Sequence, residues 1–137
     1  MLAGRYTLLE QTSLDALNYF REHQVSIFAG GVYNSGILAT GATSNAQYNY
    51  AVAPPEIMSR ARKLETICQR YNVPLNAAAV QFVWAQPACT SLVIGADQVD
   101  QVKVNLDTLD VPIPAAYWAE LQAEGLIADG APLPQSN

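Results

Sequence analysis

Two glycine-bearing turns hold the residues whose types and spacing best suit a chemical role. The first is GGVYNSG at residues 30–36, directly after the apolar run Val25–Ala29, and the second is Gly95-Ala96-Asp97, after another apolar run. Glycine lets a backbone approach an anion closely, and successive N–H groups in such a turn can hold phosphate. A plain exit from a strand also uses glycine, and Asp97 could simply cap the helix that follows. The residues alone leave both interpretations open.

Side chains for acid–base, nucleophilic or metal chemistry are sparse. The single histidine, His23, falls at the predicted end of a helix, where an imidazole more often meets the terminal carbonyls than acts as a base. The two cysteines, Cys68 and Cys89, have neither metal-ligand nor redox spacing. We therefore predict no catalytic residue and no metal site in this chain.

Strands alternating with helices must position the two turns. Strands are predicted at 2–9, 25–29 and 91–95, and short apolar runs such as 25–29 are typical of strands buried on both faces. A capping box at Thr12–Asp15 opens a helix that runs to about His23, and Pro54-Pro55 opens another. Residues 43–53 are expected to form a surface excursion. The predicted helices cover 12–23, 54–72, 76–85, 98–107 and 115–125. This order predicts an α/β fold of parallel βα units.

Composition and charge exclude several classes of protein. The chain has 137 residues, of which 50% are hydrophobic and 14% charged, which fits one folded domain rather than a disordered chain. The net charge is −5, and one basic cluster at Arg60–Arg70 does not supply the basic face that a nucleic acid requires. There is neither a long apolar run nor a signal-like start. We predict a cytoplasmic protein without membrane or nucleic-acid partners.

Four stretches of the sequence resemble the aldo-keto reductase superfamily. They are GRYTLLEQ at 4–11, VSIFAGGVYNSGILATG at 25–41, the long segment from APPEIM to LVIGA at 53–96, and DQVKVN at 100–105 with IPAAYWAEL beyond it. The second and third are most similar to the bacterial sugar dehydrogenase branch, which includes L-fucose and D-threo-aldose 1-dehydrogenases and pyridoxal dehydrogenase. The resemblance covers almost the whole chain.

The resemblance implies part of a (β/α)8 barrel. Residues 1–126 would supply strands six to eight with their helices, as an incomplete domain, and residues 127–137 are expected to be a disordered tail. The family's catalytic tyrosine, lysine, aspartate and histidine lie in the first half of its members, and no position here matches them. Tyr6, Tyr33, Lys63 and His23 therefore take none of those roles.

The resemblance also implies a nicotinamide cofactor. The residues carried over as cofactor-binding are Gly31, Val32, Asn34 and Ser35 at the pyrophosphate, Gly95 and Ala96 near the adenosine ribose, and Gln101 and Asn105 at the adenine end. An aromatic residue that stacks on the nicotinamide in many members is replaced here by Gly30. Members that prefer NADP place lysine or arginine at the positions of Gly95 and Gln101, and Asp97 would repel a 2′-phosphate. We therefore expect NAD rather than NADP.

The function expected from the sequence is that of a truncated aldo-keto reductase. It would be the cofactor-binding part of an NAD(P)-dependent oxidoreductase acting on sugars or aldehydes, and inactive alone. The alternative is a non-enzymatic oligomeric or partner-binding module derived from that fold. In either case the edges near Arg5–Leu9 and Leu92–Ile94, and the face that would line the barrel, lack partners, so we expect a homo-oligomer.

Overall fold

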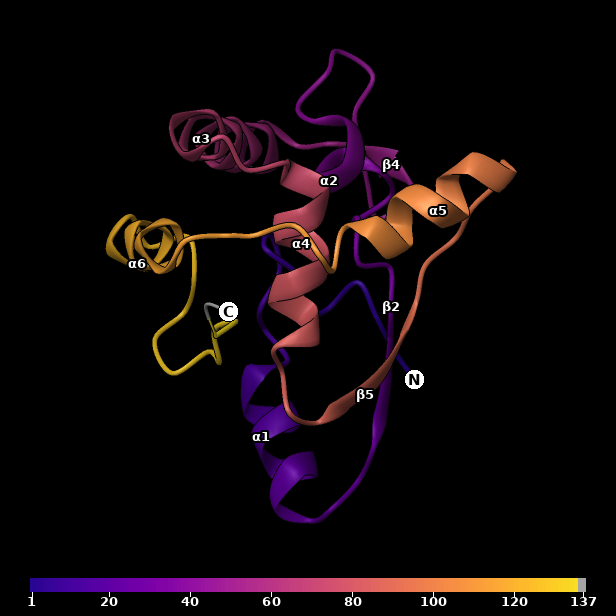
Figure 1. The fold of residues 1–137 in the computed structure, drawn as a ribbon, viewed down its shortest axis with the longest axis vertical. Coiled ribbons are helices and arrows are strands. Elements are labelled where there is room, and N and C mark those ends of the chain that lie inside the picture. Colours follow the sequence, from indigo (N-terminus) through magenta and orange to yellow (C-terminus); the bar gives the residue numbers. More distant parts are fainter. Residues whose placement is uncertain (136–137) are drawn as a thin grey trace.

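A three-stranded parallel sheet organises the computed structural model, which describes residues 1–135 (Figure 1). Its strands are β1 (Leu2–Ala3), β2 (Ile27–Gly30) and β5 (Cys89–Val93), in the spatial order β1-β2-β5. Leu2 pairs with Ala29 on one side of β2, and Phe28 pairs with Ser91 on the other. The predicted α/β class with parallel strands is confirmed.

The first strand is much shorter than predicted. The chain leaves the sheet at Gly4, whose φ of 64° is left-handed. Thr7 then holds a local turn, because its Oγ1 accepts hydrogen bonds from the N–H groups of Leu9 and Glu10 at 3.2 and 3.1 Å. A side chain that bonds its own backbone in this way competes with a strand ladder. The prediction of a strand and an open edge over residues 5–9 is therefore wrong, and Tyr6 and Leu8 join the core instead.

Helices cover one face of the sheet and leave the other face open. α1 (Leu14–Glu22) and α4 (Leu75–Trp84) lie on the same side of β2 and β5 (Figure 1). Successive side chains of a strand point to opposite faces. Ile27 and Ala29 are accordingly buried, whereas Phe28 and Val93 are 55% and 49% exposed. The prediction that these strands are buried on both faces is wrong for this chain, because nothing among residues 1–135 covers the second face.

A long connection follows β2. It contains the short helix α2 (Ile37–Thr40) and an antiparallel hairpin of β3 (Gln47–Tyr48) and β4 (Ala51–Val52). The predicted surface excursion thus contains paired strands, with its tip at Tyr50 almost fully exposed. The connection ends at α3 (Pro55–Tyr71), which begins at a proline as expected.

The C-terminal part packs against α3. α5 (Val99–Asp107) leads to α6 (Ala115–Ala123), where Tyr117 and Trp118 are buried. Beyond α6, Ile127 and Ala131 are also buried, and the Ala128 N–H donates to Gln11 Oε1 at 2.7 Å. The prediction of a disordered tail is therefore wrong through Leu133, which packs partly against the core; residues 136–137 lie outside the described residues. Within the described range, the helices are too short or too polar to cross a membrane.

Candidate functional site

The loop after β2 combines left-handed residues with backbone N–H groups that lack an acceptor among residues 1–135. Gly31 is left-handed with φ of 64°, and three consecutive residues, Asn34, Ser35 and Gly36, have φ of 44°, 60° and 97°. Across residues 1–135, the N–H groups of Val32, Tyr33 and Ser35 have no hydrogen-bond acceptor. Unbonded N–H groups in a turn with left-handed residues form a concavity suited to an anion. The first glycine-bearing turn thus keeps backbone N–H groups that have no acceptor among residues 1–135.

Buried polar contacts fix the shape of this loop. The Asn34 side chain is 2% exposed; its Oδ1 accepts a hydrogen bond from Thr7 Oγ1, and its Nδ2 donates to the Gly4 carbonyl at 3.4 Å. A Cβ at Gly31 would lie 2.9 Å from the Gly4 nitrogen, so only glycine fits there. Asn34 and the buried Val32 side chain are therefore not free to contact a ligand, and they act by holding the loop.

Ser35 ties the loop to the hairpin. Its Oγ accepts a hydrogen bond from the Tyr50 N–H at 2.9 Å. Tyr50 and its neighbour Asn49 are both left-handed, with φ of 64° and 51°. Two residues with positive φ form the tight turn that joins β3 to β4. The hairpin therefore sits against the same loop that carries the unbonded N–H groups.

The second turn is exposed and open. Gly95 and Ala96 are exposed, and a Cβ added at Gly95 would meet no atom within 4 Å. Gln101 reaches back, and its Oε1 accepts a hydrogen bond from the Asp97 N–H at 3.0 Å. The N-cap of α5 is Gln98, which makes no side-chain cap bond, so Asp97 is not the cap.

A hydrogen bond that the sequence did not predict joins the first turn to α5, the helix that follows the second turn. The Tyr33 hydroxyl donates to Asn105 Oδ1 at 2.9 Å, across 72 residues of sequence. Burial raises the pKa of Tyr33, which keeps its hydroxyl protonated and able to donate. The structure therefore brings Asn105, from the second predicted set, to the loop of the first set. No local pattern marks this pair, because its members belong to different βα units.

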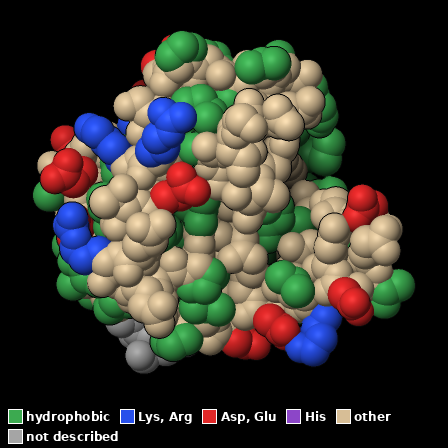
Figure 2. Space-filling view, turned by 90° about the horizontal axis from the view of Figure 1, so that it is seen from above, with side chains coloured by type: hydrophobic (Ala, Val, Ile, Leu, Met, Phe, Trp, Pro, Cys, Tyr) green, Lys and Arg blue, Asp and Glu red, His purple; other side chains and the backbone are tan. Residues whose placement is uncertain are grey.

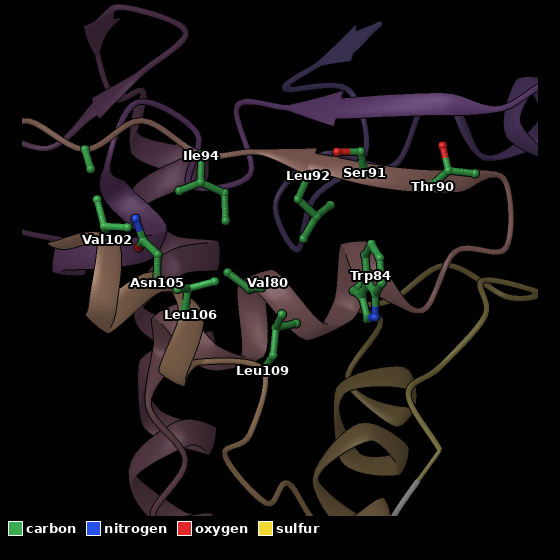
Figure 3. A pocket seen from close by; sticks show the side chains of 11 residues that line it. Val80, Trp84, Thr90, Ser91, Leu92, Ile94, Val102, Asn105, Leu106 and Leu109 are labelled. Atoms are coloured by element: carbon green, nitrogen blue, oxygen red, sulfur yellow. The ribbon is translucent and has the colours of Figure 1, made fainter.

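An apolar groove lies beside these turns, between α4, β5 and α5 (Figure 3). Its volume is about 330 Å³. Figure 3 shows Leu92 and Ile94 pointing from the β5 segment towards α4 and α5. The lining residues are Val80, Trp84, Thr90, Ser91, Leu92, Ile94, Ala96, Val102, Asn105, Leu106 and Leu109. The apolar residues Val99, Val102 and Leu106 are spaced as on one face of a helix, and the sequence predicted that helix. The spacing did not show that this apolar stripe remains exposed to solvent.

The ionisable contacts elsewhere hold elements together. Burial opposes ionisation of Glu10, but hydrogen bonds from Thr12 and from the Tyr48 hydroxyl outweigh it and lower the pKa of the carboxyl. Burial and the bond to Glu10 raise the pKa of Tyr48 to about 12. The hydrogen bond between Tyr48 and Glu10 connects β3 to the turn after β1. Within residues 1–135, no three His, Cys, Asp or Glu side chains are grouped as metal ligands.

Comparisons with known proteins agree with this architecture. The family model described as the aldo/keto reductase family matches residues 1–124. The chain is 40% identical over 129 residues to pyridoxal 4-dehydrogenase of Microbacterium luteolum, a match covering 93% of this chain and 38% of that enzyme. It is 38% identical over 129 residues to D-threo-aldose 1-dehydrogenase of a Pseudomonas species, covering 39% of that enzyme. The chain thus spans about two fifths of these relatives.

Solved structures show the same fold. An aldo-keto reductase of Bacillus halodurans, in its holo form, superposes with a TM-score of 0.67 at 21% identity, covering 94% of this chain and 43% of that one. Its apo form gives the same TM-score at 22% identity. The family and the branch that the sequence resembles are both confirmed. The chain belongs to the aldo-keto reductase family.

Proposed function

We propose that this chain is the dinucleotide-binding C-terminal part of an NAD-linked aldo-keto reductase acting on sugars or aldehydes. Its three parallel strands would be strands six to eight of a (β/α)8 barrel. The observation that carries the proposal is the pair of unbonded N–H groups at Tyr33 and Ser35, in a loop of left-handed residues. It lies at the carboxyl end of β2, and barrels of this kind bind their ligands at the carboxyl ends of the strands.

The residues of this chain would hold a pyrophosphate and an adenosine. The N–H groups of the half-buried Tyr33 and Ser35 would donate to phosphate oxygens, while the buried Val32 and Asn34 keep the loop in its left-handed shape. Gly95 would leave room for the ribose, since no atom lies within 4 Å of a Cβ placed there. Nearby Asp97 would repel a 2′-phosphate, which favours NAD. The bound nicotinamide would supply hydride transfer.

The chain by itself would not catalyse that transfer. A general acid or base must reach the reacting carbon, and its loss alone removes about 10²–10⁴ in rate. Tyr6 is buried at 2% exposure, and burial raises the pKa of its hydroxyl. The Tyr33 hydroxyl is occupied by Asn105. Neither tyrosine offers an accessible proton beside a lysine.

Titration calorimetry with NAD and with NADP tests the proposal, together with an assay of NAD reduction by D-threo-aldoses, L-fucose or simple aldehydes. We expect NAD to bind with a dissociation constant of about 1 mM, or −4 kcal/mol, more tightly than NADP, and without turnover. Binding of neither nucleotide would refute the cofactor assignment. Turnover that a substitution in this chain abolishes would refute the claim of inactivity.

One observation favours a second function, a self-associating module without catalysis. Phe28 and Val93 are half exposed on the open face of the sheet, and a parallel sheet is normally covered on both faces. A module of this kind would form oligomers that bury this face and would bind no nucleotide. Light scattering at micromolar concentration, run beside the calorimetry, separates the two functions.

A further inference from the structure

Tyr50 occupies a backbone position that suits a tyrosine poorly. It is the second of two left-handed residues in the turn between β3 and β4, with φ of 64° after 51° at Asn49. Glycine is favoured at such a position, and a bulky side chain there costs stability. The Tyr50 side chain is also 93% exposed, so contacts within the chain do not offset that cost. The stability of the fold therefore does not explain why this residue is a tyrosine.

The hairpin that carries Tyr50 is anchored on two sides. In β3, the Tyr48 hydroxyl donates to Glu10 Oε2 at 2.8 Å. At the tip, the Tyr50 N–H donates to Ser35 Oγ at 2.9 Å. The tyrosine ring thus extends from a backbone that is held in place. An aromatic side chain also has only two rotatable bonds, so this ring loses little conformational freedom when it binds a ligand.

The turn at Tyr50 lies on the β1 side of the sheet. A Cβ at Gly4, directly after β1, would lie 3.8 Å from the Oδ1 atom of Asn49, the residue before Tyr50. β2 is the middle strand in the order β1-β2-β5, so the loop after β2 has the hairpin on one side and α5 on the other. The loop bonds the hairpin through Ser35 and bonds α5 through Tyr33.

This arrangement gives the two ends of a dinucleotide different neighbours. With the pyrophosphate on the loop and the adenosine near Gly95 on the β5 side, the nicotinamide would extend towards β1 and the hairpin. β1 and β2 end in Ala3 and Gly30, which offer it no aromatic ring. The oxidised nicotinamide is a planar cation, and a cation is attracted to the face of an aromatic side chain. Figure 2 looks down on the end of the molecule that carries the hairpin, and most Lys and Arg side chains in view lie on the left, on the side of α3.

We propose that Tyr50 binds the nicotinamide end of the dinucleotide through the face of its aromatic ring. The assignment rests on the function proposed above, because the loop after β2 must hold the pyrophosphate for the nicotinamide to lie beside the hairpin. It also accounts for the left-handed backbone of Tyr50, since strained residues cluster where a protein contacts its ligand. Glycine would make the turn more stable but would leave the nicotinamide without this contact.

Tyr50→Gly tests this assignment, because glycine suits the left-handed backbone and keeps the N–H bond to Ser35 but removes the ring. The probes are NAD and ADP-ribose, which share the adenosine, the pyrophosphate and the second ribose and differ in the nicotinamide. In NMR titrations of the full chain, we expect NAD to bind about fivefold more tightly than ADP-ribose. Tyr50→Gly should reduce that ratio about threefold or more without lowering the melting temperature. Tyr50→Phe, which keeps a ring, should preserve the ratio.

Gln24→Gly is the matched control. Gln24 is exposed and left-handed, with φ of 57°, but it precedes β2, at the opposite end of that strand from the loop. This variant should leave the ratio of the two affinities unchanged.

Two results would overturn the Tyr50 assignment and leave the pyrophosphate site standing. One is equal affinity of the wild-type chain for NAD and ADP-ribose, and the other is a ratio that Tyr50→Gly does not change. A lower melting temperature for Tyr50→Gly would show that the ring stabilises the fold, which also contradicts the assignment. Binding of neither probe would refute the proposed function and the role of Tyr50 together.

Discussion

Replacing Asn34 by alanine should destabilise the chain far more than the same change at an exposed asparagine. Asn34 is buried, and its side chain bonds Thr7 and the Gly4 carbonyl. A buried polar group left without its partner costs about 1–3 kcal/mol. The left-handed backbone, with φ of 44°, adds about 1–2 kcal/mol for a residue other than glycine or asparagine. We expect a loss of about 2–5 kcal/mol in the free energy of unfolding.

Asn49→Ala is the matched control, because Asn49 is exposed and also left-handed, with φ of 51°. It should cost about 1–2 kcal/mol, from the backbone alone. Asn34→Gly separates the two contributions, since glycine accepts the left-handed backbone but lacks the carboxamide. Urea unfolding followed by circular dichroism measures all three. Equal losses for Asn34→Ala and Asn49→Ala would refute the claim that buried hydrogen bonds hold the loop.

Three further predictions follow from single positions. Gly41→Ala should destabilise the fold by about 1–3 kcal/mol, because φ is 86° there and a Cβ would meet Glu65 Oε1. In urea unfolding, the double variant with Glu65→Ala should recover only part of that loss. Full recovery would show that the left-handed backbone does not contribute. Because its pKa is lowered in the fold, the ionised Glu10 carboxyl stabilises the folded chain above the unfolded carboxyl pKa of about 4.3, and this stabilisation is lost as pH falls through the folded pKa. Glu10→Gln should therefore lower the melting temperature at pH 7 more than at pH 3. An equal drop in melting temperature at both pH values would contradict this. Gly95→Arg should shift nucleotide preference towards NADP about tenfold in calorimetry, since a side chain there meets no atom within 4 Å; an unchanged ratio would place the 2′-hydroxyl elsewhere.

Much of the fold could be predicted from local patterns. Pro55 at the first turn and Asn72 at the C-cap bound α3 within a residue or two of the prediction. The strand–helix order correctly predicted a parallel sheet. These features depend on residues close together in the sequence, where capping chemistry and apolar periodicity act.

The failed predictions have one local cause and several distant ones. The apolar run at 2–9 predicted a strand, but the hydroxyl of Thr7 and the left-handed Gly4 form a turn there. The composition of the tail suggested disorder, yet Gln11 holds Ala128 from 117 residues away. The Tyr33–Asn105 bond, which links the two halves of the candidate site, likewise depends on tertiary packing. The uncovered stripe of α5 had the same pattern as a buried one, because periodicity does not show whether a neighbour is present.

We propose that the loop after β2 binds the pyrophosphate of NAD through its backbone N–H groups. It is tested most directly by titrating the ¹⁵N-labelled chain with NAD and following amide resonances by NMR. We predict saturable shifts of the Tyr33 and Ser35 amides, with a dissociation constant of about 1 mM, that Asn34→Ala abolishes while Asn49→Ala leaves them intact. Shifts confined to other amides, or no saturable shift at these two up to roughly tenfold that concentration, would show that the loop does not bind the pyrophosphate.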